Sequence, residues 1–101
     1  MKKEICLEAA CGRAYVTSEV LYDKFNEIHM FDQDQRAIDL VKDKFKNKPK
    51  VSLMIAKIMQ SFEWVSKYNC IILRYCINYL ENDEIEEVLK KAQKSLKVST
   101  D

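Results

Sequence analysis

Two carboxylates in this sequence are well placed to do chemistry, because each stands at the end of a short apolar segment. Glu8 follows the apolar run 5–7, and Asp32 follows a second run at 28–31. Small residues fill most of the stretch 9–14 directly after Glu8, including the single glycine of the chain, Gly12. Such a turn lets the backbone approach a ligand closely, and a carboxylate supplies two acceptors for ribose hydroxyls. The pattern predicts a nucleotide-binding site on two neighbouring strands.

Each of these features also has a purely structural interpretation. Asp32 opens the polar stretch 32–35, where an aspartate can form a turn. The small residues of 9–14 would equally serve close packing between a strand and a helix. Phe62 and Trp64 are expected to be core residues rather than residues that stack on a ligand.

The apolar pattern predicts the elements that would position these residues. We expect strands at 5–7, 28–31, 51–55 and 70–73, each a short and mostly apolar run. Residues 59–65 are expected to form a loop or a short helix. Strands that alternate with helices indicate an α/β fold with a parallel sheet and right-handed crossovers.

Three segments have helical spacing. The segment 16–25 is expected to be capped by Thr17 or Ser18, and the segment 35–46 to lie on the sheet as an amphipathic helix. In the last helix we expect Asp83 and Glu86 to form a capping box. One apolar stripe is expected along it, made of Ile85, Val88, Leu89, Ala92 and Leu96.

Composition narrows the class of protein. With 101 residues the chain holds one domain at most, and 17 basic against 16 acidic residues leave a formal net charge of +1. This balance does not favour nucleic acid or an anionic membrane as a partner. No apolar run near the first residue is long enough for a signal peptide or a membrane span, so we expect a cytoplasmic or nuclear protein. Cysteines 6, 11, 70 and 76 lack Cys-x-x-Cys spacing, so we expect reduced thiols and no metal site.

The turn after the first strand resembles the first loop of the S-adenosylmethionine (SAM) dependent methyltransferases. That loop reads Asp/Glu-x-Gly-x-Gly-x-Gly, and residues 8–14 here read Glu-Ala-Ala-Cys-Gly-Arg-Ala, which keeps the middle glycine. From about residue 6 to 97 the chain is most similar to the protein N-terminal (alpha-amino) methyltransferases. Residues 59–62, Met-Gln-Ser-Phe, match that family's Leu-Gln-x-Phe. Residues 68–80 match its Tyr-Asp-x-Ile-x-x-Gln-Trp-x-x-x-His-Leu in spacing.

The resemblance implies a Rossmann-like class I methyltransferase half-domain. It would have about four parallel strands in the order 3-2-1-4, flanked by helices, with SAM as cofactor and a protein or peptide as substrate. Asp32 would bind the ribose, Met59 and Gln60 would line the adenine, and Gly12 would face the methionine moiety. The full set of expected cofactor-binding residues is Glu8, Ala10, Gly12, Arg13, Asp32, Met59 and Gln60.

The resemblance also places Arg74, Tyr75 and Tyr79 on the substrate side. Tyr75 stands at the position of a tryptophan that lines the family's peptide pocket, and Tyr79 at that of a histidine. Tyr15 replaces an arginine that pairs with the SAM carboxylate, so Arg13 would have to supply that contact. The residues that hold and deprotonate the family's substrate lie beyond the fourth helix. We therefore expect residues 1–101 to be a truncated domain whose catalytic residues are unknown.

Three functions are compatible with these features. The first is an active methyltransferase that modifies a protein N-terminal α-amino group. The second is a catalytically inactive subunit that keeps the fold as a scaffold in a protein assembly. The third is a nicotinamide-dinucleotide domain, which the single loop glycine disfavours. Because the fourth strand would be an apolar sheet edge, we expect either a homodimer or a second polypeptide to cover it.

Overall fold

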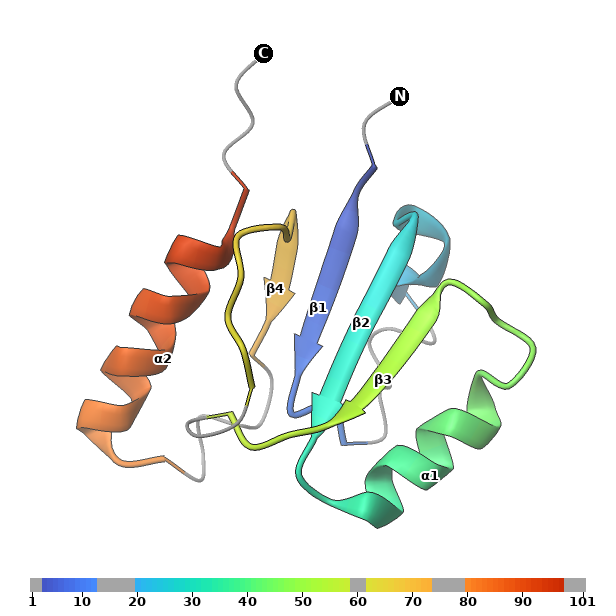
Figure 1. Ribbon diagram of the computed structural model, residues 1–101, viewed down its shortest axis with the longest axis horizontal. Coiled ribbons are helices and arrows are strands. Elements are labelled where there is room, and N and C mark those ends of the chain that lie inside the picture. Colours follow the sequence, from blue (N-terminus) through green and yellow to red (C-terminus); the bar gives the residue numbers. More distant parts are fainter. Residues whose placement is uncertain (1–2, 13–19, 59–61, 74–79, 98–101) are drawn as a thin grey trace.

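The protein folds around a four-stranded parallel sheet. The computed structural model describes residues 3–12, 20–58, 62–73 and 80–97. The strands are β1 (Ile5–Ala9), β2 (Glu27–Asp32), β3 (Val51–Ile55) and β4 (Cys70–Ile72). They lie in the order β3-β2-β1-β4, and every neighbouring pair is parallel (Figure 1). The expected fold class and the order 3-2-1-4 are confirmed.

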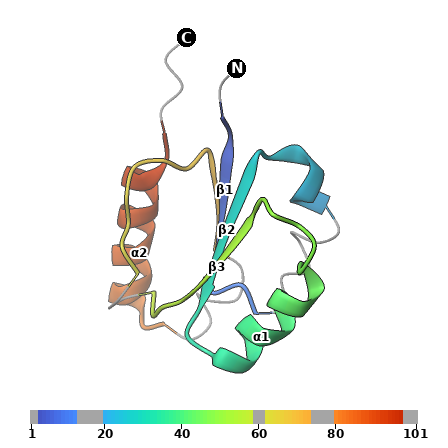
Figure 2. The same ribbon diagram turned by 45° about the vertical axis from the view of Figure 1, so that its right-hand side comes forward.

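Helices cover both faces of the sheet. Figure 2 shows α1 (Gln35–Lys44) on one side of the strands and α2 (Asn82–Ser95) on the other. The short 3-10 helix η2 (Tyr22–Lys24) lies on the same side as α1. The helix expected at 35–46 is thus confirmed, and it ends at Lys44. Of the helix expected at 16–25, residues 16–19 lie outside the described part of the chain, and the described residues 20–25 contain the short η2 in place of an α-helix.

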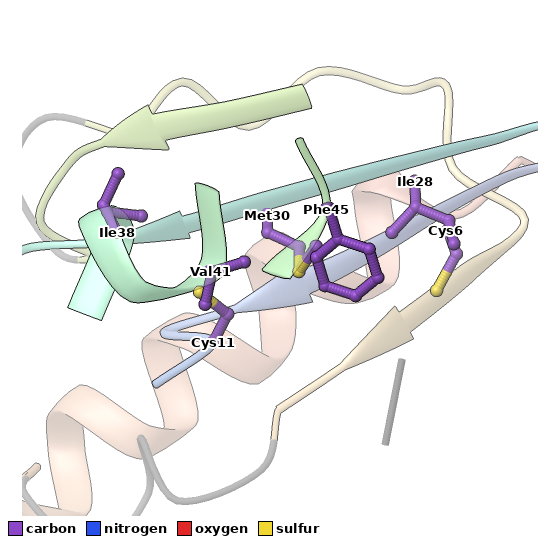
Figure 3. Close-up of a cluster of buried hydrophobic side chains, with 7 residues drawn as sticks. All are labelled: Cys6, Cys11, Ile28, Met30, Ile38, Val41 and Phe45. Carbon is purple, nitrogen blue, oxygen red and sulfur yellow. The ribbon is translucent and has the colours of Figure 1, made fainter. Parts of the chain in front are cut away.

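The alternation of side chains along β1 divides the core into two clusters. On the α1 side, Cys6 packs with residues of β2 and α1 (Figure 3); that cluster is Cys6, Cys11, Ile28, Met30, Ile38, Val41 and Phe45. On the other face, Leu7 and Ala9 pack with Phe31, Ala56 and Tyr68. A strand buried on both faces needs apolar residues at successive positions, which explains the nearly continuous apolar runs in the sequence.

Phe62 and Trp64 belong to the second cluster. The Phe62 ring stacks on Phe31 with ring centroids 3.9 Å apart, and the Trp64 ring meets Phe62 edge-on at 5.0 Å. The Trp64 Nε1–H donates to the Ile58 carbonyl at 3.4 Å. The structural interpretation of these two aromatic residues is confirmed, because they complete the core over β2.

The start of α2 differs from the sequence prediction. The capping box consists of Glu81 and Glu84, and the Glu84 carboxylate accepts the Glu81 backbone N–H at 2.9 Å. The prediction of Asp83 and Glu86 was wrong because Asp83 already lies inside the helix, where its backbone cannot take the extended cap conformation. The predicted stripe is also narrower, since Val88 and Ala92 are buried while Leu89 is 48% exposed.

The chain after α2 returns to the outer edge of the sheet near β4. The Tyr68 N–H donates to the Ser95 carbonyl at 3.2 Å, and the Lys97 N–H donates to the Tyr68 carbonyl at 2.6 Å. These bonds form a parallel bridge between Tyr68 and Leu96, just before β4 begins. The β4 edge of the sheet, which we expected to be open, is therefore covered by the chain around Leu96 just before β4 begins. A partner chain on the rest of β4 stays a prediction.

Two features are absent from the described residues: a helix that could span a membrane and a cluster of metal ligands. None of the helices there has the length and apolar character needed to cross a bilayer. No group of three or more His, Cys, Asp or Glu side chains in the same residues is arranged to hold a metal ion.

The turn after β1 contains two residues in the left-handed region of backbone space. Ala10 has a φ of 51° and Gly12 a φ of 53°. Between them, the Cys11 N–H donates to the carbonyl of Phe31, in β2, at 2.9 Å. The left-handed region costs a residue with a Cβ about 1–2 kcal/mol, and glycine almost nothing. Gly12 therefore suits its position, whereas Ala10 is strained.

Replacing Ala10 by glycine should stabilise the protein. We expect Ala10→Gly to raise the free energy of unfolding by about 0.5–1 kcal/mol, because relief of the strained φ exceeds the added flexibility of the unfolded chain. Urea unfolding followed by circular dichroism measures this. The matched control Ala9→Gly, at a fully buried strand position, should instead destabilise the protein. Equal or lower stability of Ala10→Gly would contradict the strain argument.

His29 should make stability depend on pH. Burial lowers the pKa of His29 below its ordinary value of 6.5, and Lys67 lowers it further, while Glu27 opposes the shift. The unfolded chain then binds the proton at a higher pH than the folded chain. Stability should therefore be greatest above about pH 6.5 and fall as the pH drops from there through the folded pKa.

His29 is the only histidine, so its ring protons can be followed by NMR during a pH titration. We expect a midpoint below 6.5 and a weaker loss of stability on acidification in the His29→Gln variant. A midpoint at or above 6.5 would show that the interaction with Glu27 outweighs burial.

Candidate functional site

The candidate site lies at the carboxyl edge of the sheet, where β1 and β2 end side by side. Ala9 is in register with Phe31, so the turn after β1 begins next to the last residues of β2. Figure 1 shows these strands ending at one edge, where the chain also enters α1. In parallel α/β sheets, loops that bind ligands gather at this edge. The structure thus brings together the two segments that the sequence singled out.

Asp32 holds this edge together with both carboxylate oxygens. Its Oδ2 accepts the backbone N–H of Gly12 at 3.0 Å, and its Oδ1 accepts the backbone N–H of Asp34 at 2.9 Å. Its own carbonyl accepts the N–H of Ala56, after β3, at 3.0 Å. Asp32 therefore connects the turn after β1, the start of the loop before α1 and the segment after β3.

The arrangement leaves room for a ligand with hydroxyl groups. An ionised carboxylate has about four acceptor positions on its two oxygens, so Asp32 keeps capacity beyond the two backbone donors. Among the described residues, no atom lies within 4 Å of a Cβ built on Gly12, so none of them crowds the space beside that residue. A carboxylate with acceptor positions to spare, beside this glycine, fits the ribose of a nucleoside cofactor. The residues present at the edge are thus compatible with the cofactor that the resemblance implies.

Glu8 and Cys11, on either side of the start of the turn, both have buried side chains. Glu8 is only 3% exposed and lies next to Met30 and Ile72 in register, so its carboxyl is among the few buried polar groups of the sheet. Burial raises the pKa of the Cys11 thiol to about 12, and the nearby charges of Asp32 and Glu8 add to this rise. The Cys11 thiol therefore stays neutral. The carboxyl groups of Glu8, in β1, and Asp32, in β2, both act on it at this edge of the sheet.

The structure tests only part of the predicted set. Glu8, Ala10, Gly12 and Asp32 lie at the carboxyl edge as expected, in β1, the turn after it and the end of β2. Their contacts with a cofactor stay predictions. The remaining predicted residues lie outside the described part of the chain: Arg13, Met59, Gln60, Arg74, Tyr75 and Tyr79.

Sequence reasoning missed one function of Asp32. It identified the carboxylate as a ribose ligand or a turn former, but not as the acceptor that fixes the Gly12 backbone. The Asp32-Gln33-Asp34 sequence does indicate the local turn, since an aspartate commonly accepts the N–H two residues later. The bond to Gly12 has no such signal, because it joins residues that only the pairing of β1 with β2 brings together.

Comparison with known proteins identifies the family of this chain. A sequence profile described as a methyltransferase domain matches residues 6–99. The alpha N-terminal protein methyltransferase 1 of Dictyostelium discoideum is 30% identical over 94 residues, which cover 91% of this chain and 35% of that protein. The ribosomal RNA small subunit methyltransferase A of Prochlorococcus marinus is 33% identical over 60 residues, which cover 59% of this chain and 22% of that protein. The chain thus spans about a third or less of the length of these two relatives.

Solved structures share the fold. A SAM-dependent methyltransferase from Leishmania major superposes with a TM-score of 0.85 at 14% identity, covering 95% of this chain and 39% of that one. The N-methyltransferase NodS from Bradyrhizobium japonicum, solved with S-adenosyl-L-homocysteine, superposes with a TM-score of 0.81 at 21% identity, covering 93% of this chain and 47% of that one. At these identities the likeness shows the fold. Since the domain profile spans nearly the whole sequence, the chain belongs to the methyltransferase domain family.

Proposed function

We propose that this chain binds SAM at the carboxyl edge of β1 and β2 and supplies the cofactor-binding part of a protein N-terminal α-amino methyltransferase. The observation that supports it most directly is the arrangement of Gly12 and Asp32. The Asp32 carboxylate, with acceptor positions beyond its two backbone donors, lies beside the left-handed Gly12, which none of the described residues crowds. Membership in the methyltransferase domain family supports the same cofactor.

The residues of the edge would divide the work of binding. Asp32 would accept hydrogen bonds from the ribose hydroxyls while it keeps Gly12 in place, and the space beside Gly12 would admit the methionine moiety. When bound, SAM supplies a methyl group on a positively charged sulfonium. The buried carboxyl of Glu8 and the carboxylate of Asp32 favour a cation at this edge. Most of the rate enhancement would then come from positioning the acceptor against the methyl group.

The proposed methyl acceptor is a protein N-terminus. The Dictyostelium relative whose name states this activity matches 91% of the chain, whereas the relative named for ribosomal RNA matches 59%. Residues Arg74, Tyr75 and Tyr79 are the proposed substrate-side contacts, on the resemblance of segment 68–80 to that family. They follow β4, which pairs directly with the strand that leads into the cofactor turn.

A second function, that of a catalytically inactive subunit, has one specific observation in its favour. Ala10 takes a left-handed conformation at a position where the family loop has glycine, so the turn carries a Cβ and backbone strain. Such a loop would keep the fold but weaken cofactor binding. In that case the chain would act as a scaffold, with a partner on the β4 edge.

Titration of the chain with SAM in a calorimeter tests cofactor binding. We expect Asp32→Asn to weaken SAM binding at least about tenfold, equivalent to about 1.4 kcal/mol, because its NH₂ group would face a backbone N–H and one ribose acceptor would be lost. The matched control Asp43→Asn makes the same chemical change on the exposed side of α1 and should leave the dissociation constant unchanged.

The outcomes separate the candidate functions. SAM binding that depends on Asp32 supports the proposed cofactor site. No heat with SAM or with NAD, from a chain that is folded by circular dichroism, would favour the inactive subunit. Binding of NAD in preference to SAM would contradict the proposal.

Methyl transfer to peptides tests the proposed acceptor. With the full-length polypeptide and SAM, we expect a mass increase of one methyl group on a peptide whose α-amino group is free. The same peptide with an acetylated N-terminus should stay unmodified, because its amide nitrogen has no available lone pair. A lysine in both peptides serves as the internal control. Methylation of that lysine, or of the acetylated peptide, would contradict the N-terminal specificity.

A further inference from the structure

Two cysteines lie opposite each other on neighbouring strands, away from the cofactor turn. Cys6 of β1 is in direct register with Cys70 of β4. Both belong to the α1 side of the sheet, where Cys70 packs against the cluster that contains Cys6. Figure 3 shows the Cys6 side chain extending from β1 into this cluster. Both are free thiols in the structure.

The strand geometry suits a covalent bond between these thiols. Neighbouring strands lie about 4.7–4.9 Å apart, and residues in register on one face point the same way. Disulfides join residues whose Cα atoms are usually about 4.4–6.8 Å apart, so the pair falls within reach. The Cys70 thiol is also close enough to hydrogen-bond to the Cys6 thiol. No change of register is needed for the two sulfur atoms to meet.

We propose that Cys6 and Cys70 form a peroxide-sensitive dithiol that closes into a disulfide between β1 and β4. In the first step the Cys70 thiolate attacks a peroxide oxygen, so that an S–O bond forms and the O–O bond breaks. The departing hydroxide combines with the proton that the Cys70 thiol has released and leaves as water, so that Cys70 now carries a sulfenic acid. In the second step the Cys6 sulfur attacks that sulfur, and the hydroxyl group leaves as water with the Cys6 proton. The two thiols lose two electrons, and the peroxide gains them.

The environments of the two thiols assign these roles. Cys6 is fully buried, and burial together with the adjacent Cys70 thiol raises its pKa. It therefore keeps its proton and reacts second. Cys70 is half-buried, so a small peroxide can reach it first. Cys11 is a poorer partner, because its thiol lies in the turn beyond β1 and donates to the Gly12 carbonyl at 3.7 Å.

The proposed disulfide would join the strand that leads into the cofactor turn to the strand that leads into the predicted substrate-side residues. β1 leads into the turn at Gly12, and β4 leads into residues 74–79. A disulfide between them would hold β1 and β4 together covalently. The two strands could then come apart only when the disulfide is reduced. The inference does not depend on which cofactor or substrate the chain takes.

Peptide mapping after oxidation tests the proposal on the full chain. The protein is treated with hydrogen peroxide, the remaining thiols are blocked with N-ethylmaleimide, and the chain is cleaved with trypsin. Cleavage after Lys3 and Arg13 releases residues 4–13, and cleavage after Lys67 and Arg74 releases residues 68–74, which contain Cys70 alone. We expect a linked pair of these peptides that is lighter by two hydrogen atoms, with fragment ions assigning the bond to Cys6. Dithiothreitol should separate the pair.

Single cysteine-to-serine variants identify the two bonded cysteines without relying on the fragment ions. Cys70→Ser should abolish the linked pair, whereas Cys11→Ser and Cys76→Ser should leave it in place. Circular dichroism checks that each variant is folded, and the map of the unaltered chain remains decisive if one is not. A bond from Cys70 to Cys11 or Cys76 would overturn the proposal. Accumulation of sulfinic acid on Cys70 without any disulfide would overturn it as well.

Discussion

The hydrogen bond from the Gly12 backbone N–H to the Asp32 carboxylate is the interaction on which the candidate site depends. It joins a turn that has little side-chain mass of its own to the end of a strand that is buried on both faces. The neighbouring bond from the Cys11 N–H to the Phe31 carbonyl extends the pairing of β1 with β2 into the turn. Together the two bonds hold Cys11 and Gly12 against the end of β2, so that this part of the turn is in position before a ligand binds.

Asp32 has to serve two demands at once. Its carboxylate satisfies backbone donors at Gly12 and Asp34, and the proposed function asks it to accept ribose hydroxyls as well. A carboxylate can meet both demands because each oxygen has more than one lone pair. An asparagine has one acceptor oxygen and a donor group, so it cannot. The chemical identity of this residue therefore follows from the backbone donors at this edge as much as from any ligand.

The central position of β1 gives this strand more than one task. It pairs with β2 on one side and β4 on the other, contributes to both core clusters, and leads into the turn at Gly12. Its residues alternate between the two faces: Cys6 and Glu8 lie on the α1 side, and Leu7 and Ala9 on the other. A substitution in β1 is consequently expected to alter the packing of both core clusters and the position of the candidate site.

The sequence by itself determined most of the strands and helices and their succession along the chain. Strand β3 was predicted with its observed bounds, because its mostly apolar run begins just after the breaker at 47–49. The start of α2 was predicted less well. Acidic residues at 81, 83, 84 and 86 allow the capping box in two frames, and only the backbone conformation at Glu81 selects one. The sequence also identified Glu8, Gly12 and Asp32, since each carries a signal in its residue type and its place after an apolar run.

Tertiary structure decided what joins these residues. The bond between Gly12 and Asp32, the register of Cys6 with Cys70 and the bridge from Leu96 to Tyr68 all join residues far apart in the chain. Each depends on the order and register of strands, which local composition does not encode. Alanine by itself carries no local signal for the left-handed φ of Ala10, and the pairing of β1 with β2 on either side of that residue imposes the conformation. Local periodicity thus specified the parts, and the packing of parallel strands determined their contacts.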